Sequence, residues 1–220
     1  MTDIALDYER FRQLWQRCLI GSAADESAVI HQQLIAFYSE PQRFYHTLTH
    51  IEHCLSLIDK VSSELQSPEA LELAIWFHDV VYEPGAVDNE QLSADRFMAI
   101  TEGVFNDMVR DTVYQHIMAT VHDSAEIIHP DTKYMLDIDL SSFGRPWSEF
   151  IQDSHNLRLE LEDWPDEVFY QRQKDFQDKL FGQARFFRSD YFYDHYEAQA
   201  QQNHNDYFET VRVKLQAGDR

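Results

Sequence analysis

Residues Ser67–Tyr82 have the sequence SPEALELAIWFHDVVY, which forms the most apolar stretch of the chain. Ser67 followed by Pro68 and Glu69 is typical of a helix start, because serine caps a helix, proline fits its first turn and an acid suits the helix dipole. From Pro68 to about Tyr82, apolar side chains occur on nearly every face of the expected helix. Such a helix is stable only when it is buried, so this stretch predicts the central helix of a helical core.

The same helical periodicity extends outward over nearly all of the 220 residues. Only six glycines and six prolines are present, too few for a chain built from many strands and tight turns. We expect an all-α fold, a bundle of about ten helices in one domain spanning residues 1–220. Its core should cover about residues 25–145, and a C-terminal helical lobe about residues 146–216. The predicted helices cover approximately residues 6–19, 25–39, 47–66, 68–82, 88–102, 105–121, 131–143, 146–162, 165–181 and 191–216.

The chain is strongly acidic, with 39 acidic residues, 18 basic residues and a formal net charge of −21. Such a surface repels duplex nucleic acid, and an anionic substrate would need a local positive charge such as a bound metal ion. No apolar run reaches the roughly 18 residues of a membrane span, and the acidic N-terminus MTDIALDYERF is unlike a signal peptide. The two cysteines, Cys18 and Cys54, form no spaced framework, which is typical of the reducing cytoplasm. We therefore expect a cytoplasmic protein, and the lack of an apolar span predicts that it does not contact membranes.

One carboxylate, that of Asp79, lies within the predicted central helix. Burying an isolated carboxylate is costly, so Asp79 must be protonated, paired or bound to a cation. Its neighbour is His78 rather than Arg or Lys, and a single divalent metal ion would satisfy both side chains. The alternative is a buried, hydrogen-bonded His–Asp pair with a purely structural role.

Two other segments carry side chains of the same kinds. His46 and His50, in the sequence RFYHTLTH, are four residues apart and share a face if one helix includes both. Asp137 and Asp139, in the sequence LDIDLS, are two residues apart and therefore cannot share a helix face.

In this order and at this spacing, the segments resemble the HD superfamily of metal-dependent phosphohydrolases, and most closely a bacterial branch of predicted phosphohydrolases. The resemblance covers roughly residues 40–200. It implies an all-helical domain, a divalent metal cofactor and hydrolysis of a phosphoester or phosphoanhydride in a small phosphorylated substrate, such as a nucleotide. The matching elements are Tyr45-His46-x-x-x-His50, Phe77-His78-Asp79-x-Val81-Tyr82, Asp88-Asn89-Glu90-x-x-Ser93-Ala94 and Leu136-Asp137-x-Asp139-Leu140-x-x-x-Gly144.

The segment around His46 also resembles an element of the cyclic-nucleotide phosphodiesterases, distant members of the superfamily. In that element the second histidine binds metal and the first is a general acid, which implies that His50 is a ligand and His46 protonates the leaving oxygen. A structural role for His46 in a first helical turn is the alternative. His53 falls on a polar helical stripe, whereas His50 shares an inward-facing stripe with Cys54, Leu57 and Val61.

Of the two aspartates, Asp139 is favoured as a ligand. The metal-binding aspartate of the phosphodiesterases is followed by Leu-Ser, as Asp139 is here, and Asp139 shares a stripe with three apolar residues. Asp137 as a hydrogen-bond acceptor at a helix end is the alternative. The expected ligands suit Mn²⁺, Fe²⁺, Co²⁺, Zn²⁺ or Mg²⁺, and they are His50, His78, Asp79 and Asp139.

Further residues complete the predicted site. By resemblance, His122 is an additional histidine near the substrate or a second metal ion, with His116 less favoured. Glu83 resembles an acid that positions water, and an ordinary polar residue at a helix end is the alternative for His122 and Glu83. Arg43 and Arg158 are candidate substrate ligands, because a guanidinium binds phosphate through two hydrogen bonds; a surface ion pair is the alternative for Arg158.

Two other functional classes are compatible with the sequence. Some proteins with the HD fold use a di-iron pair for oxygenation, which requires more ligands than the four expected here. The third candidate is a non-catalytic module that binds a nucleotide or a metal ion.

Overall fold

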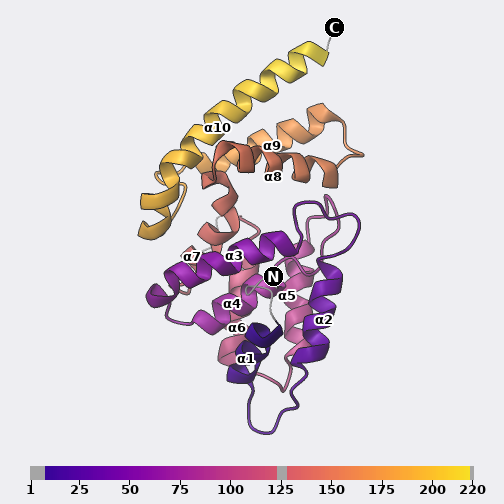
Figure 1. The fold of residues 1–220 in the computed structure, drawn as a ribbon, viewed down its shortest axis with the longest axis vertical. Helices are drawn as coiled ribbons and strands as arrows, with labels where there is room; N and C mark the ends of the chain where they lie inside the picture. Colours follow the sequence, from indigo (N-terminus) through magenta and orange to yellow (C-terminus); the bar gives the residue numbers. More distant parts are fainter. Residues whose placement is uncertain (1–7, 123–127, 219–220) are drawn as a thin grey trace. The chain divides into compact units, whose positions relative to one another are not determined.

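The structure is a computed structural model of the chain, and it describes residues 8–122 and 128–218, with side chains up to Val211. Within these residues every regular element is a helix, apart from an isolated bridge between Leu19 and Phe105. The predicted all-α fold is therefore confirmed (Figure 1). Each predicted range overlaps one observed helix, although Leu6, from the first of them, lies outside the described residues.

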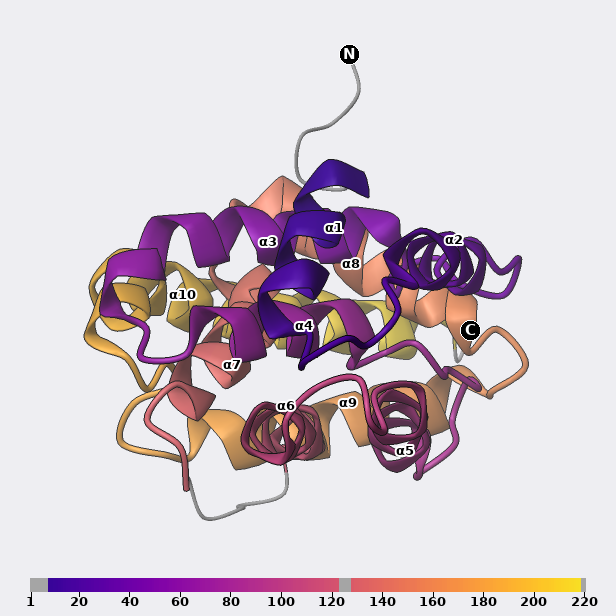
Figure 2. The same ribbon diagram turned by 90° about the horizontal axis from the view of Figure 1, so that it is seen from below.

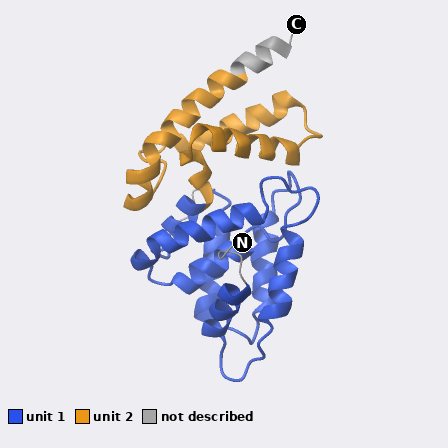
Figure 3. Cartoon of the chain, in the orientation of Figure 1, with its two compact units in different colours: residues 1–138 blue, residues 139–220 orange. Residues whose placement is uncertain are grey.

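The α-helices are α1 (Tyr8–Cys18), α2 (Ser27–Phe37), α3 (Leu48–Val61), α4 (Pro68–Phe77), α5 (Asn89–Ile100), α6 (Asp107–Ala119), α7 (Thr132–Asp139), α8 (Trp147–Glu160), α9 (Asp166–Phe181) and α10 (Asp190–Gly218). Two short 3₁₀ helices, η1 (Ser62–Glu64) and η2 (Leu140–Gly144), follow α3 and α7. The chain divides into two compact units, residues 1–138 and 139–220 (Figure 3). This division lies before the predicted start of the lobe near residue 146, because η2 packs against α10.

Helix α4 is the centre of unit 1. All of its residues from Ala70 to Phe77 are buried, which confirms the buried central helix expected from the sequence. It packs against α1, α3, α5 and α6. Figure 2 looks along the axes of α2, α5 and α6, while α3 runs across the view. Aromatic rings of α1 and α4 meet in this core. The ring centroid of Phe11 lies 5.7 Å from that of Trp15 and 5.3 Å from that of Trp76.

The C-terminal end of α4 differs from the prediction. The helix ends at Phe77 rather than near Tyr82, and the chain turns through the residues that follow. Side chains from elsewhere replace the helical hydrogen bonds there: the hydroxyl of Ser93 accepts from the N–H of Val81 at 3.1 Å, and the amide of Asn89 pairs with both backbone groups of Glu83 at 3.0 Å. These bonds pair the backbone N–H and C=O groups of Val81 and Glu83 without a helix. The apolar pattern alone therefore predicts too late an end for α4.

Hydrogen bonds join the N-terminal ends of α4 and α7. The buried carboxylate of Asp131 accepts hydrogen bonds from the N–H groups of Gln66 and Ser67, the shortest of them 2.7 Å. Next to it, Nδ1 of the fully buried His116 lies 3.1 Å from Oγ1 of Thr132. The Nε2 atom of His116 has no hydrogen-bond partner among the described residues.

Burial lowers the pKa of His116 from 6.5 to about 4, with the nearby His129 acting in the same direction and Asp131 opposing it. As the pH falls, His116 therefore takes up a proton near pH 6.5 in the unfolded chain but only near pH 4 in the folded chain. Stability from this group should be complete above pH 6.5 and decline by roughly 3 kcal/mol between pH 6.5 and 4. We expect His116→Gln to remove this part of the pH dependence of urea unfolding, and an unchanged slope would contradict the assignment.

Unit 2 is organised around the contact of η2 with α10. The side-chain amide of Asn203, fully buried in α10, donates to the carbonyl oxygens of Phe143 at 2.7 Å and Arg145 at 2.8 Å. Between these two residues, Gly144 lies against Tyr196 of α10. Helix α10 is 29 residues long, yet none of the described helices is both long and apolar enough to cross a membrane.

A Cβ atom added to Gly144 would lie 2.6 Å from Cβ of Tyr196 and 2.9 Å from its backbone oxygen. Neither atom belongs to the movable end of a side chain, so Gly144→Ala must push η2 away from α10. We expect a loss of about 1–3 kcal/mol in the free energy of unfolding, measured by urea denaturation. Ser142→Ala, at a half-buried position of the same 3₁₀ helix, is the matched control. Equal stability of the two variants would show that this close contact is not required.

Candidate metal centre

His50 comes from the first turns of α3 and points into the core of unit 1. The stripe predicted for it is buried: Cys54, Leu57 and Val61 are all fully covered, and His50 itself is 7% exposed. The Sγ atom of Cys54 lies 3.7 Å from Nε2 of His50. The imidazole thus packs against a residue of its own helix, one turn along.

His78 and Asp79 follow directly after the last residue of α4. The Nε2 atoms of His78 and His50 are 3.3 Å apart, and Oδ2 of Asp79 lies 3.0 Å from Nε2 of His78 and 4.0 Å from Nε2 of His50. Nδ1 of His78 lies 2.9 Å from the carbonyl oxygen of Ile75. Because a carbonyl oxygen only accepts, Nδ1 of His78 donates to Ile75, and Nε2 of the same ring faces His50 and Asp79.

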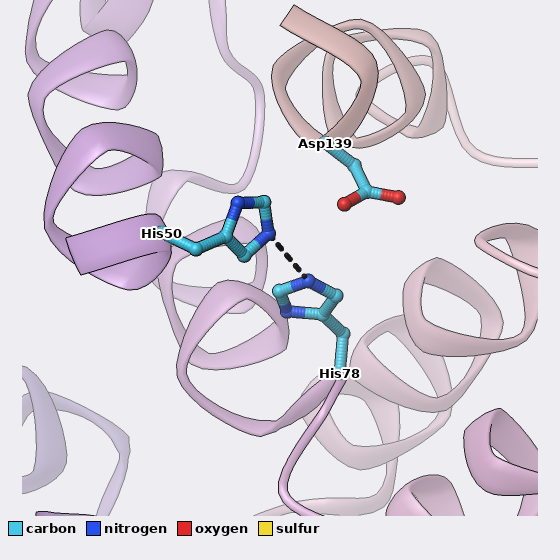
Figure 4. A group of neighbouring side chains, drawn as sticks. All are labelled: His50, His78 and Asp139. Carbon is cyan, nitrogen blue, oxygen red and sulfur yellow. Dashed lines mark hydrogen bonds between the residues drawn. The ribbon is translucent and has the colours of Figure 1, made fainter. Parts of the chain in front are cut away.

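Asp139 is the last residue of α7, and the division between the two units falls within the final turn of this helix. One nitrogen of His50, one of His78 and one carboxylate oxygen of Asp139 all lie within 4.8 Å of one another (Figure 4). This group of side chains could hold a metal ion. Asp137, the alternative to Asp139, is also buried, but it is not a member of the group.

The short separations of these atoms are compatible with a positive charge between them. Nε2 of His78 lies 3.0 Å from Oδ2 of Asp79 and 3.3 Å from Nε2 of His50, distances that suit either a shared proton or a bound cation. A single proton would serve one pair of these atoms, whereas a divalent ion would serve His50, His78 and Asp79 together. The hydrogen bond from Nδ1 to Ile75 is the outer contact that metal-binding histidines commonly make, since it fixes the tautomer and orients the ring.

The spacing of the donor atoms also suits one ion. With metal–ligand bonds of about 2.0–2.2 Å, neighbouring ligand atoms lie about 3.0–3.5 Å apart, and opposite ones about 4 Å apart. The three separations among His50, His78 and Asp79 are 3.3, 3.0 and 4.0 Å. The residues of the centre therefore fit a divalent cation without rearrangement of these three side chains.

A bound cation should stabilise the fold, because it binds a site that exists only in the folded chain. At a free metal concentration 100 times its Kd, the gain should be about 2.7 kcal/mol. We expect chelation to lower the Tm of the wild-type chain, measured by circular dichroism, and to leave that of His50→Ala unchanged. An identical Tm of the wild-type chain with and without verified metal removal would contradict a buried metal site.

His46 lies just before α3, which begins at Leu48, so His46 and His50 do not share a helix as the sequence allowed. Its ring is half-buried and packs against that of Tyr82 at a tilt of 31°, with centroids 4.2 Å apart, and it lies 6.3 Å from the ring of His50. The side chain is therefore next to the metal centre without being one of the grouped ligands. This placement is compatible with the proton donor that the sequence predicts.

The two predicted phosphate ligands have other partners in the structure. The side chain of Arg43 is 0% exposed, and its guanidinium donates to the carbonyl oxygens of Asp79 and Val80 at 2.7 and 3.1 Å. Arg158, in unit 2, pairs with Asp166 at 2.7 Å, which is the ion pair given as its alternative. We therefore do not retain either guanidinium as a phosphate ligand.

Two of the remaining candidates, Glu83 and His122, lie just beyond helix ends, and two, His53 and His116, lie within helices. Glu83 is exposed and lies beyond the end of α4, so its expected position one helical turn after Asp79 is wrong. His122 follows α6 with a backbone φ of 54°, an unusual conformation for a residue other than glycine. His53 is half-buried on α3, and His116 contacts the start of α7, about 10 Å of helix away from Asp139 at its end. The roles that the resemblance implies for Glu83 and His122 stay predictions.

Sequence reasoning missed Asn89 and Ser93 as residues that support the centre. Asp88 precedes α5 without a side-chain cap hydrogen bond; Asn89 pairs with the backbone of Glu83, and Ser93 with that of Val81. The signal was present, because both belong to one of the matching elements quoted above and are polar residues spaced four apart on one helix face.

Taken together, the two imidazoles and the carboxylate of Asp139 form one group, and the carboxylate of Asp79 lies beside the imidazoles without being a member of that group. Such a donor set could hold a divalent transition metal and would neutralise part of its charge. A metal ion held at this point would give the acidic chain a local positive charge. Comparison of the chain with models of protein families, with curated proteins and with solved structures found no match.

Proposed function

We propose that the protein is a metal-dependent phosphohydrolase of the HD superfamily. It hydrolyses a phosphoester or phosphoanhydride in a small phosphorylated metabolite, such as a nucleotide, in the cytoplasm. The observation that carries the proposal is the grouping of one nitrogen of His50, one nitrogen of His78 and a carboxylate oxygen of Asp139 within 4.8 Å of one another, with Asp79 3.0 Å from His78. The order of the sequence elements that meet at this point supports the HD assignment.

A divalent ion held here supplies an activated water molecule and a positive charge for a phosphate oxygen. The protein supplies the rest. His50, His78 and Asp139, with Asp79 beside them, would hold the cation, and the Ile75 carbonyl orients His78. His46, at the edge of the centre, holds the proton that the leaving oxygen takes up.

The alternatives make different demands on the chain. A di-iron oxygenase needs ligands for a second ion, and His116, one of those available, contacts Thr132 at the far end of α7 instead. The four donors at the centre are sufficient for one ion, which favours hydrolysis. A module that only binds metal or nucleotide would not need the half-buried His46 beside the ligands.

The proposal is tested by measuring phosphate release from a panel of nucleotides and simple phosphoesters with Mn²⁺, Co²⁺, Mg²⁺ or Zn²⁺. We expect turnover of at least one compound that depends on the metal and stops on chelation. The same preparation is analysed for iron and for O₂ consumption. Two irons per chain with O₂ consumption would establish the oxygenase instead, and tight nucleotide binding without turnover would establish the module.

A further inference from the structure

Arg43 makes a set of contacts that neither a phosphate ligand nor an ordinary surface arginine would make. Its Nη1 donates to two carbonyl oxygens, those of Asp79 at 2.7 Å and His46 at 3.3 Å. Nη2 donates to the carbonyl oxygen of Val80 at 3.1 Å, and Nε to the carboxylate of Glu40 at 3.1 Å. The guanidinium is thus bonded on all three of its nitrogens within the chain.

The rings of two tyrosines flank this guanidinium. Its central carbon lies 5.2 Å from the ring centre of Tyr38 and 5.3 Å from that of Tyr82. Tyr82 in turn packs against His46 at 4.2 Å, and the hydroxyl of Tyr38 donates to the carbonyl oxygen of Trp76 in α4. A cation held between two aromatic rings and bonded on every nitrogen has a single orientation.

The contacts join two segments that no regular element connects. His46 lies in the irregular stretch before α3, and Asp79 lies in the turn after α4. Because Nη1 bonds to the carbonyl oxygens of both residues, the rigid guanidinium fixes the spacing between them. Those two residues carry the expected proton donor and one of the acidic side chains beside the histidines.

We infer that Arg43 is a positioning residue. It holds the backbones of Asp79 and His46 at a fixed spacing and thereby sets the geometry of the metal centre. The part that concerns His46 rests on the proposed function; the part that concerns the cation does not. Lysine cannot replace arginine here, because one ammonium nitrogen cannot reach the carbonyl oxygens of Asp79, Val80 and His46 in the same plane. A single buried positive charge at position 43 is therefore not sufficient to hold these three carbonyl oxygens in place.

The inference is tested with Arg43→Lys in the full-length chain. We expect its Kd for Mn²⁺, measured by titration calorimetry, to rise by about 10–100-fold, the usual effect of losing an outer contact of a metal ligand. At saturating Mn²⁺, kcat for alkyl phosphates should fall more than kcat for aryl phosphates, since His46 is displaced, while KM changes by less than about threefold.

The matched control is Arg10→Lys. Arg10 is also largely buried and joins segments of unit 1 through Glu72 at 2.7 Å and Asp59 at 2.9 Å, but it touches neither His46 nor Asp79. We expect it to lower the Tm with the Kd for Mn²⁺ unchanged. If Arg43→Lys does not fold, Glu40→Gln, which weakens the hydrogen bond to Nε, takes its place and should raise the Kd by about threefold or more.

Each outcome bears on the inference. An unchanged Kd for Mn²⁺ in a folded Arg43→Lys, or equal increases of Kd in the Arg43 and Arg10 variants, would overturn it. A tenfold rise in KM at saturating Mn²⁺ with kcat unchanged would return Arg43 to the role of phosphate ligand. If the wild-type chain binds Mn²⁺ but hydrolyses no phosphoester, the proposed function fails, and the change in Kd still tests the positioning role.

Discussion

His50→Ala is expected to lose bound divalent metal and hydrolytic activity together. His50 contributes a nitrogen that lies within 3.3 Å of His78 and 4.0 Å of Asp79, so its removal leaves those two groups without a shared cation of the right geometry. Loss of an outer partner of a metal ligand alone costs about 10–100-fold in affinity, so loss of a direct ligand should cost at least about 100-fold. Metal content after loading and dialysis, together with kcat/KM at a fixed Mn²⁺ concentration, measures both effects.

His53→Ala is the control, because His53 lies one turn along the same helix and is half-buried outside the centre. It should keep its metal and its activity. If His50→Ala retains a full equivalent of metal while His53→Ala loses it, the ligand on α3 has been assigned one turn too early.

The second large effect is expected for His46→Ala, which should keep its metal and lose about 10²–10⁴-fold in kcat. The loss should be greatest for alkyl phosphates, whose departing oxygen is strongly basic, and small for aryl phosphates, which leave without protonation. His46 is suited to this role because its ring is half-buried beside His50 and held in place by Tyr82 at 4.2 Å.

Kinetics on matched alkyl and aryl substrates, with metal content determined on the same samples, separates the possible roles of His46. An equal loss for both substrate types would show that His46 is not the proton donor. Loss of the metal from His46→Ala, with retention in His50→Ala, would exchange the roles of the two histidines.

Much of the fold could be predicted from the sequence because the helices carry a regular apolar pattern. The burial of α4 followed from apolar residues on every face, as its fully covered residues Leu71, Leu73 and Trp76 show. The C-terminal end of α4 could not be predicted from this pattern, because hydrogen bonds with the side chains of Arg43, Asn89 and Ser93 replace helical ones after Phe77. These partners lie far away or in another helix, and periodicity carries no information about them.

The centre was predictable to the extent that residue type and spacing determine it. His50, His78 and Asp139 were expected as ligands, and they form one group in the structure. The part played by Arg43 was not predictable, since an arginine beside a metal site is equally suited to bind phosphate or the backbone. Only its complete burial and its bonds to the carbonyl oxygens of Asp79 and Val80 decide between these.

The central claim is that these side chains bind one divalent cation, and the most direct test is the anomalous difference map of a crystal grown with Mn²⁺. The account predicts a peak in unit 1 about 2.0–2.2 Å from Nε2 of both His50 and His78 and from a carboxylate oxygen of Asp79 or Asp139. A map at full Mn²⁺ saturation with no peak within about 3 Å of these two nitrogens would contradict it.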